Sequence, residues 1–212
     1  MSIFITLEGP DGSGKSTQAK LLAEKVSALG LDVLLTREPG GSAIGDQIRQ
    51  VLFTLDNTSM HPKTEFLLFS ASRAQHVNEV IRPHLNQGGV VISDRYFHSS
   101  LAYQGYGHQL DLEKLQEITT FATGGLLPDL ILLLDLPVKE GLQRRKREGD
   151  WNRLDAYQEE FHQRVRDGYL SMAASDPERW VIIDAVPPVE EIQSNLLQVV
   201  LERLQERYSD IL

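Results

Sequence analysis

Cysteine is absent from this sequence of 212 residues. Disulfide bonds, thiolate metal sites and a cysteine nucleophile are therefore excluded. The sequence also lacks an apolar run long enough to cross a membrane, so we expect no membrane partner. The first apolar run begins at Ile3 and leaves no room for a signal peptide, and a cytoplasmic location is the expectation.

Basic residues are in deficit. The 21 Lys and Arg residues against 30 Asp and Glu residues give a formal net charge of -9 at pH 7. This charge disfavours a nucleic-acid partner, because nucleic-acid binding needs a basic surface. A content of 41% hydrophobic and 24% charged residues is typical of a globular protein, and the length suits a single domain over residues 1–212.

Short apolar runs alternate with helical patterns along the whole chain. The expected strands are 3–7, 32–36, 90–93, 129–134 and 180–184. The expected helices are 17–29, 44–55, 63–85, 97–104, 112–123, 138–147, 155–174 and 188–207. This alternation predicts a three-layer α/β/α fold, in which helices cover both faces of a five-stranded parallel sheet. We interpret the run 32–36 as a buried strand.

A glycine-rich loop joins the first strand to the first helix. Its residues are Gly9, Pro10, Asp11, Gly12, Ser13, Gly14, Lys15 and Ser16, with Thr17 next. The pattern Gly-x-x-x-x-Gly-Lys-Ser between a strand and a helix is that of a phosphate-binding loop. Its glycines let backbone N–H groups surround a phosphate, and the helix N-terminus adds partial positive charge. Lys15 is expected to reach the β- and γ-phosphates of a nucleoside triphosphate, and Ser16 to ligate Mg²⁺.

Two aspartates follow predicted strands and are candidate partners of Ser16 at the metal. Asp94 follows the third strand and Asp135 follows the fourth. We prefer Asp94, because Arg95 comes next and one strand end would then supply both metal and phosphate ligands. For either aspartate the alternative is a helix N-cap or turn residue.

The strongly basic segment of the chain is 144–153. Arg144 and Arg147 can share a helix face, and a mobile insert is expected over 148–152, just before Arg153. Such a segment matches a lid that closes over a triphosphate and supplies charge to the transferring phosphoryl group. The alternative is a solvated helix face.

Two further stretches carry candidate substrate contacts. The run 37–41 lies just past the second strand, where ligands sit in open α/β sheets. Phe69 and Arg73 are four residues apart on a predicted helix and therefore point the same way. An aromatic ring can stack on a base, and a guanidinium group only donates hydrogen bonds. The alternative is a core phenylalanine beside a surface arginine.

Taken together, these motifs resemble the thymidylate kinase family of P-loop nucleoside-monophosphate kinases. The matching stretches are 7–17, 36–41, 69–73, 94–96, 102–105 and the basic lid. They follow the family's order over essentially the whole chain. The resemblance implies a P-loop kinase fold, a homodimer, and Mg²⁺-dependent transfer of the γ-phosphoryl group of ATP to dTMP, giving dTDP and ADP for dTTP synthesis.

The resemblance also implies contacts to the acceptor. Asp11 is similar to an acid that contacts the 3′-hydroxyl of deoxyribose, and Arg95 to an arginine that holds the acceptor phosphate, with Arg37 assisting. Glu38–Pro39 resembles a cis peptide bond that shapes the substrate loop.

For the base and sugar, the resemblance places Phe69 on the thymine ring and Arg73 at its 4-oxo group. It also implies that Tyr103 crowds the ribose 2′ position. Ser99, Ser100 and Gln104 complete the implied substrate contacts. Ser100 stands where some members have a larger polar residue, so the contact to thymine N3 stays unassigned.

Family members differ in where they keep a catalytic arginine. Positions 10–13 contain no basic residue, so the resemblance implies the lid type, with Arg153 acting beside Lys15 and Arg95. Arg144 or Arg147 would then pack on the adenine or touch the ATP phosphates. No general base is needed, because a phosphate monoester with a second pKa of about 6 is mostly ionised at neutral pH. Another P-loop kinase and a nucleotide-dependent switch protein are the alternative functions.

Overall fold

The computed structural model describes residues 2–148, 153–154 and 157–207. Its sheet consists of β1 Ile3–Glu8, β2 Val33–Arg37, β3 Val90–Asp94, β4 Leu130–Asp135 and β5 Trp180–Asp184. Its helices are α1 Lys15–Ser27, α2 Ala43–Phe53, α3 Pro62–His76, α4 Arg82–Asn86, α5 Phe97–Ser100, α6 Leu112–Thr123, α7 Val138–Glu148, α8 Glu159–Ser175 and α9 Val189–Arg207. Two π-helical segments, η1 Val77–Ile81 and η2 Leu101–Gly107, complete the order.

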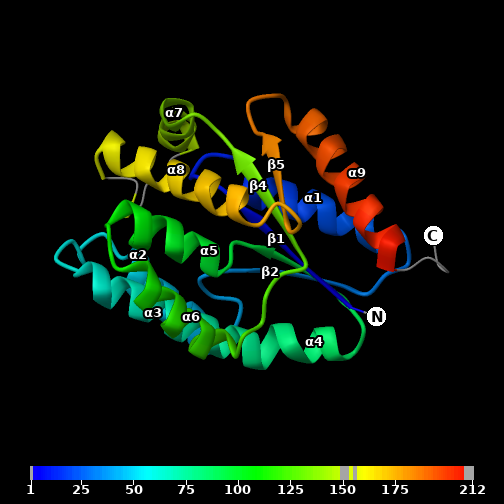
Figure 1. The fold of residues 1–212 in the computed structure, drawn as a ribbon, viewed down its shortest axis with the longest axis horizontal. Coiled ribbons are helices and arrows are strands. Elements are labelled where there is room, and N and C mark those ends of the chain that lie inside the picture. Colours follow the sequence, from blue (N-terminus) through cyan, green and yellow to red (C-terminus); the bar gives the residue numbers. More distant parts are fainter. Residues whose placement is uncertain (1, 149–152, 155–156, 208–212) are drawn as a thin grey trace.

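The five strands are all parallel and run in the order β2-β3-β1-β4-β5 (Figure 1). Alternate residues of a strand face opposite layers. In β4, Leu130, Leu132 and Leu134 pack with α1 and α9, whereas Ile131 and Leu133 pack with η2 and α8. The predicted five-stranded parallel sheet with helices on both faces is therefore confirmed.

The prediction of a buried strand at 32–36 is wrong in its burial. β2 lies at the edge of the sheet next to β3, and Leu35 is 43% exposed. An apolar run has the same composition whether one or two strands flank it, so the sequence pattern did not distinguish an edge strand from a central one.

Two predicted helices are interrupted by wider π-helical segments. The helix expected over 63–85 consists of α3, η1 and α4, and the interruption comes just before Pro83. Proline lacks the N–H that would continue the α-helical hydrogen bonds, and its ring collides with the preceding turn. The helix expected over 97–104 likewise changes into η2, which carries Tyr103 and Gln104 toward the pocket described below.

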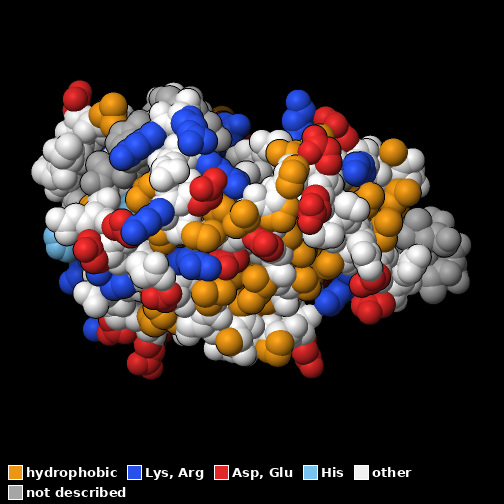
Figure 2. Space-filling view, turned by 90° about the horizontal axis from the view of Figure 1, so that it is seen from above, with side chains coloured by type: hydrophobic (Ala, Val, Ile, Leu, Met, Phe, Trp, Pro, Cys, Tyr) orange, Lys and Arg blue, Asp and Glu red, His pale blue; other side chains and the backbone are white. Residues whose placement is uncertain are grey.

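Some sequence-based expectations fall outside the described residues. These are positions 149–152 of the expected mobile insert and 155–156 of the helix expected over 155–174. Within the described ranges, no helix is both long and apolar enough to span a bilayer. On the face shown in Figure 2, acidic and basic side chains are intermingled with hydrophobic ones.

Candidate active site

The phosphate-binding loop follows β1 directly and ends on the first turn of α1. Gly12 and Gly14 have φ angles of 79° and 84°, a conformation that favours glycine. A Cβ atom at Gly12 would also clash with the backbone carbonyl of Gly141 in α7. Gly14 caps α1 without a side-chain hydrogen bond, so backbone N–H groups at this helix end are left for an anion.

Lys15 lies folded across this loop. Its Nζ donates to the carbonyl oxygen of Pro10 at 2.7 Å and to Oγ of Ser13 at 3.2 Å. Burial and then the nearby charge of Arg95 lower the pKa of Lys15 to about 8. An anionic phosphate in the loop would favour the charged lysine, and the loop is therefore poised to gain from phosphate binding.

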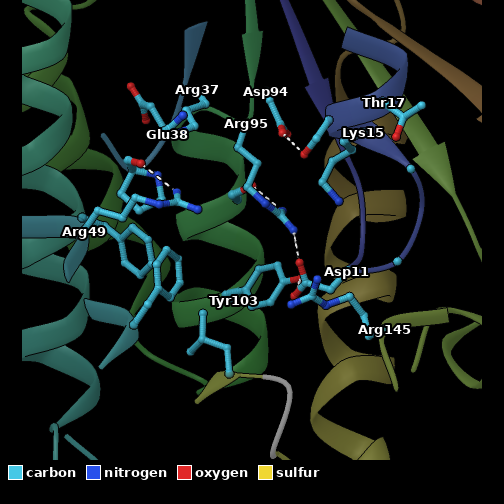
Figure 3. Close-up of a pocket in the computed structure, with 18 of the residues that line it drawn as sticks. Asp11, Lys15, Thr17, Arg37, Glu38, Arg49, Asp94, Arg95, Tyr103 and Arg145 are labelled. Carbon is cyan, nitrogen blue, oxygen red and sulfur yellow. Dashed lines mark hydrogen bonds and ion pairs between the residues drawn. The ribbon is translucent and has the colours of Figure 1, made fainter. Parts of the chain in front are cut away.

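A pocket of about 260 Å³ opens beside the loop, at the carboxyl ends of the central strands. The sequence-predicted residues that line it are Asp11, Gly12, Gly14, Lys15, Ser16, Thr17, Arg37, Glu38, Pro39, Phe69, Asp94, Arg95, Ser99, Tyr103 and Gln104. Gly9, Pro10 and Ser13 complete the loop itself, and Arg73 contacts the lining residue Glu38. Figure 3 shows Asp94, Arg95 and Lys15 converging on one space, with Asp11 and Arg145 beside each other at its far end.

Ser16 and Asp94 are in contact at the N-terminus of α1. The Ser16 hydroxyl donates to Oδ2 of Asp94, while Oδ1 of Asp94 is buried and has no hydrogen-bond partner among the described residues. The alternative aspartate is engaged elsewhere: Asp135 accepts a two-pronged pair from Arg166, at 2.7 and 2.8 Å. The geometry thus favours Asp94 over Asp135 as the carboxylate that faces Ser16.

Arg95 occupies an unusual backbone conformation, with φ of 70° in a residue other than glycine. Its backbone N–H donates to the backbone carbonyl of Leu7 at 2.9 Å. Its Nη1 donates to Gly9 at 3.1 Å, Ser99 at 2.9 Å and Tyr169 at 3.2 Å. The surrounding structure therefore fixes this guanidinium group within the pocket.

Asp11 completes the arrangement around Arg95. It forms an ion pair with Nη2 of Arg95 and accepts a hydrogen bond of 2.7 Å from the Tyr103 hydroxyl. Burial by itself would raise the pKa of Asp11, but the charges of Arg95 and Lys15 outweigh it and hold that pKa well below its usual range. Asp11 is therefore an ionised acceptor, and both Asp11 and Arg95 line the pocket.

Glu8 is a buried carboxyl group that sequence reasoning missed. It accepts hydrogen bonds from the Tyr96 N–H at 2.8 Å, the Ser99 hydroxyl at 2.6 Å and the Tyr169 hydroxyl at 3.1 Å. Burial raises the pKa of Glu8 to about 7, against the opposing hydrogen bonds and the Arg95 charge. Ser99 and Tyr169, which donate to Glu8, also accept hydrogen bonds from Arg95, so Glu8 helps to fix the groups that position that arginine.

Arg73 is almost fully buried, and this excludes the alternative of a surface arginine. Its Nε donates to Glu38 at 2.7 Å and its Nη2 donates to Ser100 at 2.9 Å. Glu38 also contacts His76 at 3.0 Å, and the peptide bond Glu38–Pro39 is cis, as the resemblance implied. The third nitrogen, Nη1 of Arg73, is buried and has no partner among the described residues.

Gln104 shows the complementary pattern. Its Nε2 donates to Oε1 of Glu65 at 2.6 Å, while its Oε1 is buried without a partner in the described part of the chain. Phe69 lines the same pocket, edge to face with Phe53 at a ring separation of 6.5 Å. The pocket thus combines an aromatic wall, one buried donor nearby and one buried acceptor.

Several lining residues had no distinctive sequence pattern. Phe53 lines the pocket, and Arg49 lies 4.7 Å over its ring while donating to the carbonyl of Pro39 at 2.9 Å. Arg145 and Leu154 also line it. A helix-face arginine such as Arg49 has the same sequence pattern whether it faces solvent or a pocket, because only the packing of α2 on α3 decides this.

Comparison with known proteins gives a consistent result. A sequence model of the thymidylate kinase family matches residues 7–196. The thymidylate kinase of Roseiflexus sp. (strain RS-1) is 51% identical over 212 residues, covering 94% of both chains. That of Pseudomonas fluorescens (strain Pf0-1) is 48% identical over 92% of both chains.

This chain belongs to the thymidylate kinase family. The crystal structure of thymidylate kinase from Ehrlichia chaffeensis agrees with the fold, with a TM-score of 0.78 at 32% identity over 94% of this chain and 98% of that one. The predicted family and the predicted class, a nucleoside-monophosphate kinase phosphotransferase, are both confirmed.

Of the basic segment 144–153, which is predicted to form a lid, residues 144–148 and 153 are described. Arg144 donates to Glu140 at 3.1 Å and to the carbonyl of Ala185 at 3.0 Å. Arg153 is buried away from the pocket lining, where it pairs with Glu65 and contacts the Leu52 carbonyl at 3.4 Å. Arg145, from the same basic segment, lines the pocket. The catalytic role of Arg153 and the contacts of Arg144 or Arg147 with ATP stay predictions.

Proposed function

We propose that this chain transfers the γ-phosphoryl group of ATP to dTMP, giving dTDP and ADP. The observation that supports this substrate is a pair of buried atoms that have no hydrogen-bond partner among the described residues, Nη1 of Arg73 and Oε1 of Gln104. Thymine presents an acceptor at O4 and a donor at N3–H, so a fixed donor and a fixed acceptor complement it. Cytosine presents an amino donor and an N3 acceptor, and both contacts would fail.

We infer that the remaining acceptor contacts follow the pocket wall. Phe69 would stack on the base, because the face of any base can rest on an aromatic ring. Asp11, an ionised acceptor, would receive the 3′-hydroxyl hydrogen bond, and Tyr103 would limit space at the 2′ position. Arg95 would hold the acceptor phosphate, with Arg37 at the rim of the pocket.

Phosphoryl transfer requires two anions to meet, so the main task of the site is to neutralise and align charge. Lys15 and the N–H groups at the start of α1 would bind the ATP phosphates. The Ser16 hydroxyl and Asp94 fit a hard divalent cation, since Oδ1 of Asp94 is buried and unpartnered among the described residues. When bound, Mg²⁺ supplies positive charge to the phosphate oxygens. The phosphate-binding loop 9–16, the substrate region 37–73 and the lid 144–153 would work as parts of one domain, in the cytoplasm.

Measuring kcat/KM with different nucleoside monophosphates as phosphate acceptors tests the proposed base contacts directly. Wild-type enzyme should prefer dTMP, and Arg73→Gln should lower the dTMP-to-dCMP ratio of kcat/KM by about tenfold or more, because one wrong base contact costs about 1–3 kcal/mol. The double variant Arg73→Gln with Glu38→Gln controls for the buried charge left by the single change. Equal wild-type rates with dTMP, UMP and AMP would contradict the proposed substrate, and unchanged selectivity would remove Arg73 from the site.

We also propose that the chain forms a homodimer through α3 and α6, which pack against each other. Leu67 on α3 is 53% exposed, and Phe121 on α6 is 90% exposed. A large apolar side chain with so much exposure favours a protein partner. Sedimentation at micromolar concentration should give a dimer for the wild type and a monomer for Phe121→Glu. A monomeric wild type, or a dimer that Phe121→Glu leaves intact, would contradict this interface.

A further inference from the structure

Glu65 is a fully buried carboxylate whose function nothing in the sequence pattern indicated. It lies in the first turn of α3 with none of its surface exposed. Burying a carboxylate is costly unless it is paired and hydrogen-bonded. Around Glu65 this need is met by Arg153, which pairs with Oε2, and by Gln104, which donates to Oε1 at 2.6 Å. Nε2 of His108 lies 3.6 Å from Oε1.

The charge state of Glu65 determines what it can offer to Gln104. Burial alone would raise its pKa, but hydrogen bonds from its neighbours and the Arg153 charge lower that pKa on balance. An ionised carboxylate only accepts hydrogen bonds. The Gln104 amide must therefore present its NH₂ group to Glu65, which leaves its carbonyl oxygen as the atom without a partner among the described residues.

The orientation of this amide would determine which bases it can hydrogen-bond. A glutamine side chain offers a donor and an acceptor of nearly equal size, so without a fixed partner it serves either partner type. Turned one way it accepts from the N3–H of thymine, and turned the other way it donates to N3 of cytosine. A rigid partner that accepts but never donates removes the second possibility.

We propose that Glu65 is a positioning residue for base selectivity: it holds the Gln104 amide with Oε1 toward the pocket, and Arg153 supplies its counter-charge. The inference rests on the proposed function, in which Gln104 contacts the base, and Glu65 would keep the Gln104 amide in one orientation. In this arrangement Arg153 also has a role: its positive charge offsets the free-energy cost of burying the Glu65 carboxylate next to the pocket.

The first test is Glu65→Gln, measured as the ratio of kcat/KM for dTMP to that for dCMP. An amide at position 65 can donate or accept, so the Gln104 amide becomes free to turn. We expect the ratio to fall about tenfold, the loss that corresponds to one hydrogen bond of about 1.4 kcal/mol. A merely structural role would lower both rates alike and leave the ratio unchanged, which would overturn the proposal.

The second test exchanges the two groups in Glu65→Gln with Gln104→Glu. The new amide at position 65 would donate to the new carboxylate at position 104 and accept from Arg153. The carboxylate has only acceptor oxygens, so one faces the pocket again. Assayed at pH 8 to keep it ionised, the double variant should recover the wild-type ratio within about threefold, a difference below 1 kcal/mol. A ratio as low as that of the single variant would overturn the orientation argument.

Glu79→Gln is the matched control, because Glu79 also accepts a hydrogen bond from a glutamine amide, that of Gln75 at 2.7 Å, but lies exposed. Its selectivity should equal that of the wild type. If Glu65→Gln does not fold, the exchanged double variant alone decides between the two outcomes. A wild type without preference for dTMP over dCMP would remove the proposed function, whereas a preference that Glu65→Gln leaves intact would remove only the role of Glu65.

Discussion

Replacing Arg95 by methionine is expected to lower kcat/KM for dTMP by about a hundred- to a thousandfold, while the affinity for ATP changes little. The size follows from removing one fixed donor that faces developing charge in an enclosed site. Arg95 already has a strained backbone conformation and is held by Gly9, Ser99 and Tyr169, so it would bind the acceptor phosphate without reorganising first. Methionine keeps much of the length and loses every donor.

Steady-state kinetics with dTMP and ATP varied in turn provide the measurement. Arg166→Met is the matched control, because Arg166 also forms an ion pair with an aspartate, Asp135, at 2.7 Å, but does not line the pocket. That control should keep near wild-type values for both substrates. A loss in Arg95→Met confined to the KM for ATP would show that this guanidinium serves the donor and not the acceptor.

Lys15→Met should lower turnover by a similar factor, about a hundred- to a thousandfold, for a different reason. Lys15 would contact the β- and γ-phosphates, where negative charge builds up during transfer. An effect realised mainly in the transition state appears in kcat more than in KM. Lys25→Met, at the exposed end of α1, is the control that leaves the loop intact.

The same lysine gives the wild type a pH dependence. With a pKa lowered to about 8, Lys15 in the free enzyme loses its charge as the pH rises through that value. The kcat/KM for ATP reports ionisations of the free enzyme, so it should decline above about pH 8. Lys15→Met should lack this decline. A wild-type profile that stays flat to pH 9.5 would contradict a neutral lysine in the ligand-free loop.

Many residues of the candidate site could be predicted from the sequence because they lie at the carboxyl ends of strands. Apolar runs at the start of the chain and before Asp94 define parallel strands, and parallel strands place their carboxyl ends together. The loop glycines, Lys15 and Ser16 are set by local backbone geometry, so a short pattern suffices to find them. Arg95 was identified by its position directly after Asp94.

Residues that act through long-range packing could not be found in this way. Glu8 comes just after the predicted strand 3–7 and Glu65 lies within the predicted helix 63–85, yet both carboxyl groups are fully buried. Their burial depends on Ser99 of α5, Tyr169 of α8 and Arg153, which lie from 88 to 161 positions away in the chain. The same holds for Arg153. A basic run predicts a lid, but it does not show which of its side chains is buried against the rest of the protein.

The position of β1 in the sheet has a consequence for biosynthesis. β1 leaves the ribosome before the other strands of the sheet, and its neighbours β3 and β4 begin only at Val90 and Leu130. At about 5–20 residues per second, the nascent chain carries its glycine-rich loop for several seconds or more before any strand can flank it. Nucleotide capture is therefore a late event in the life of the new chain, and an incomplete chain ending before Leu130 would hold the motif without the site.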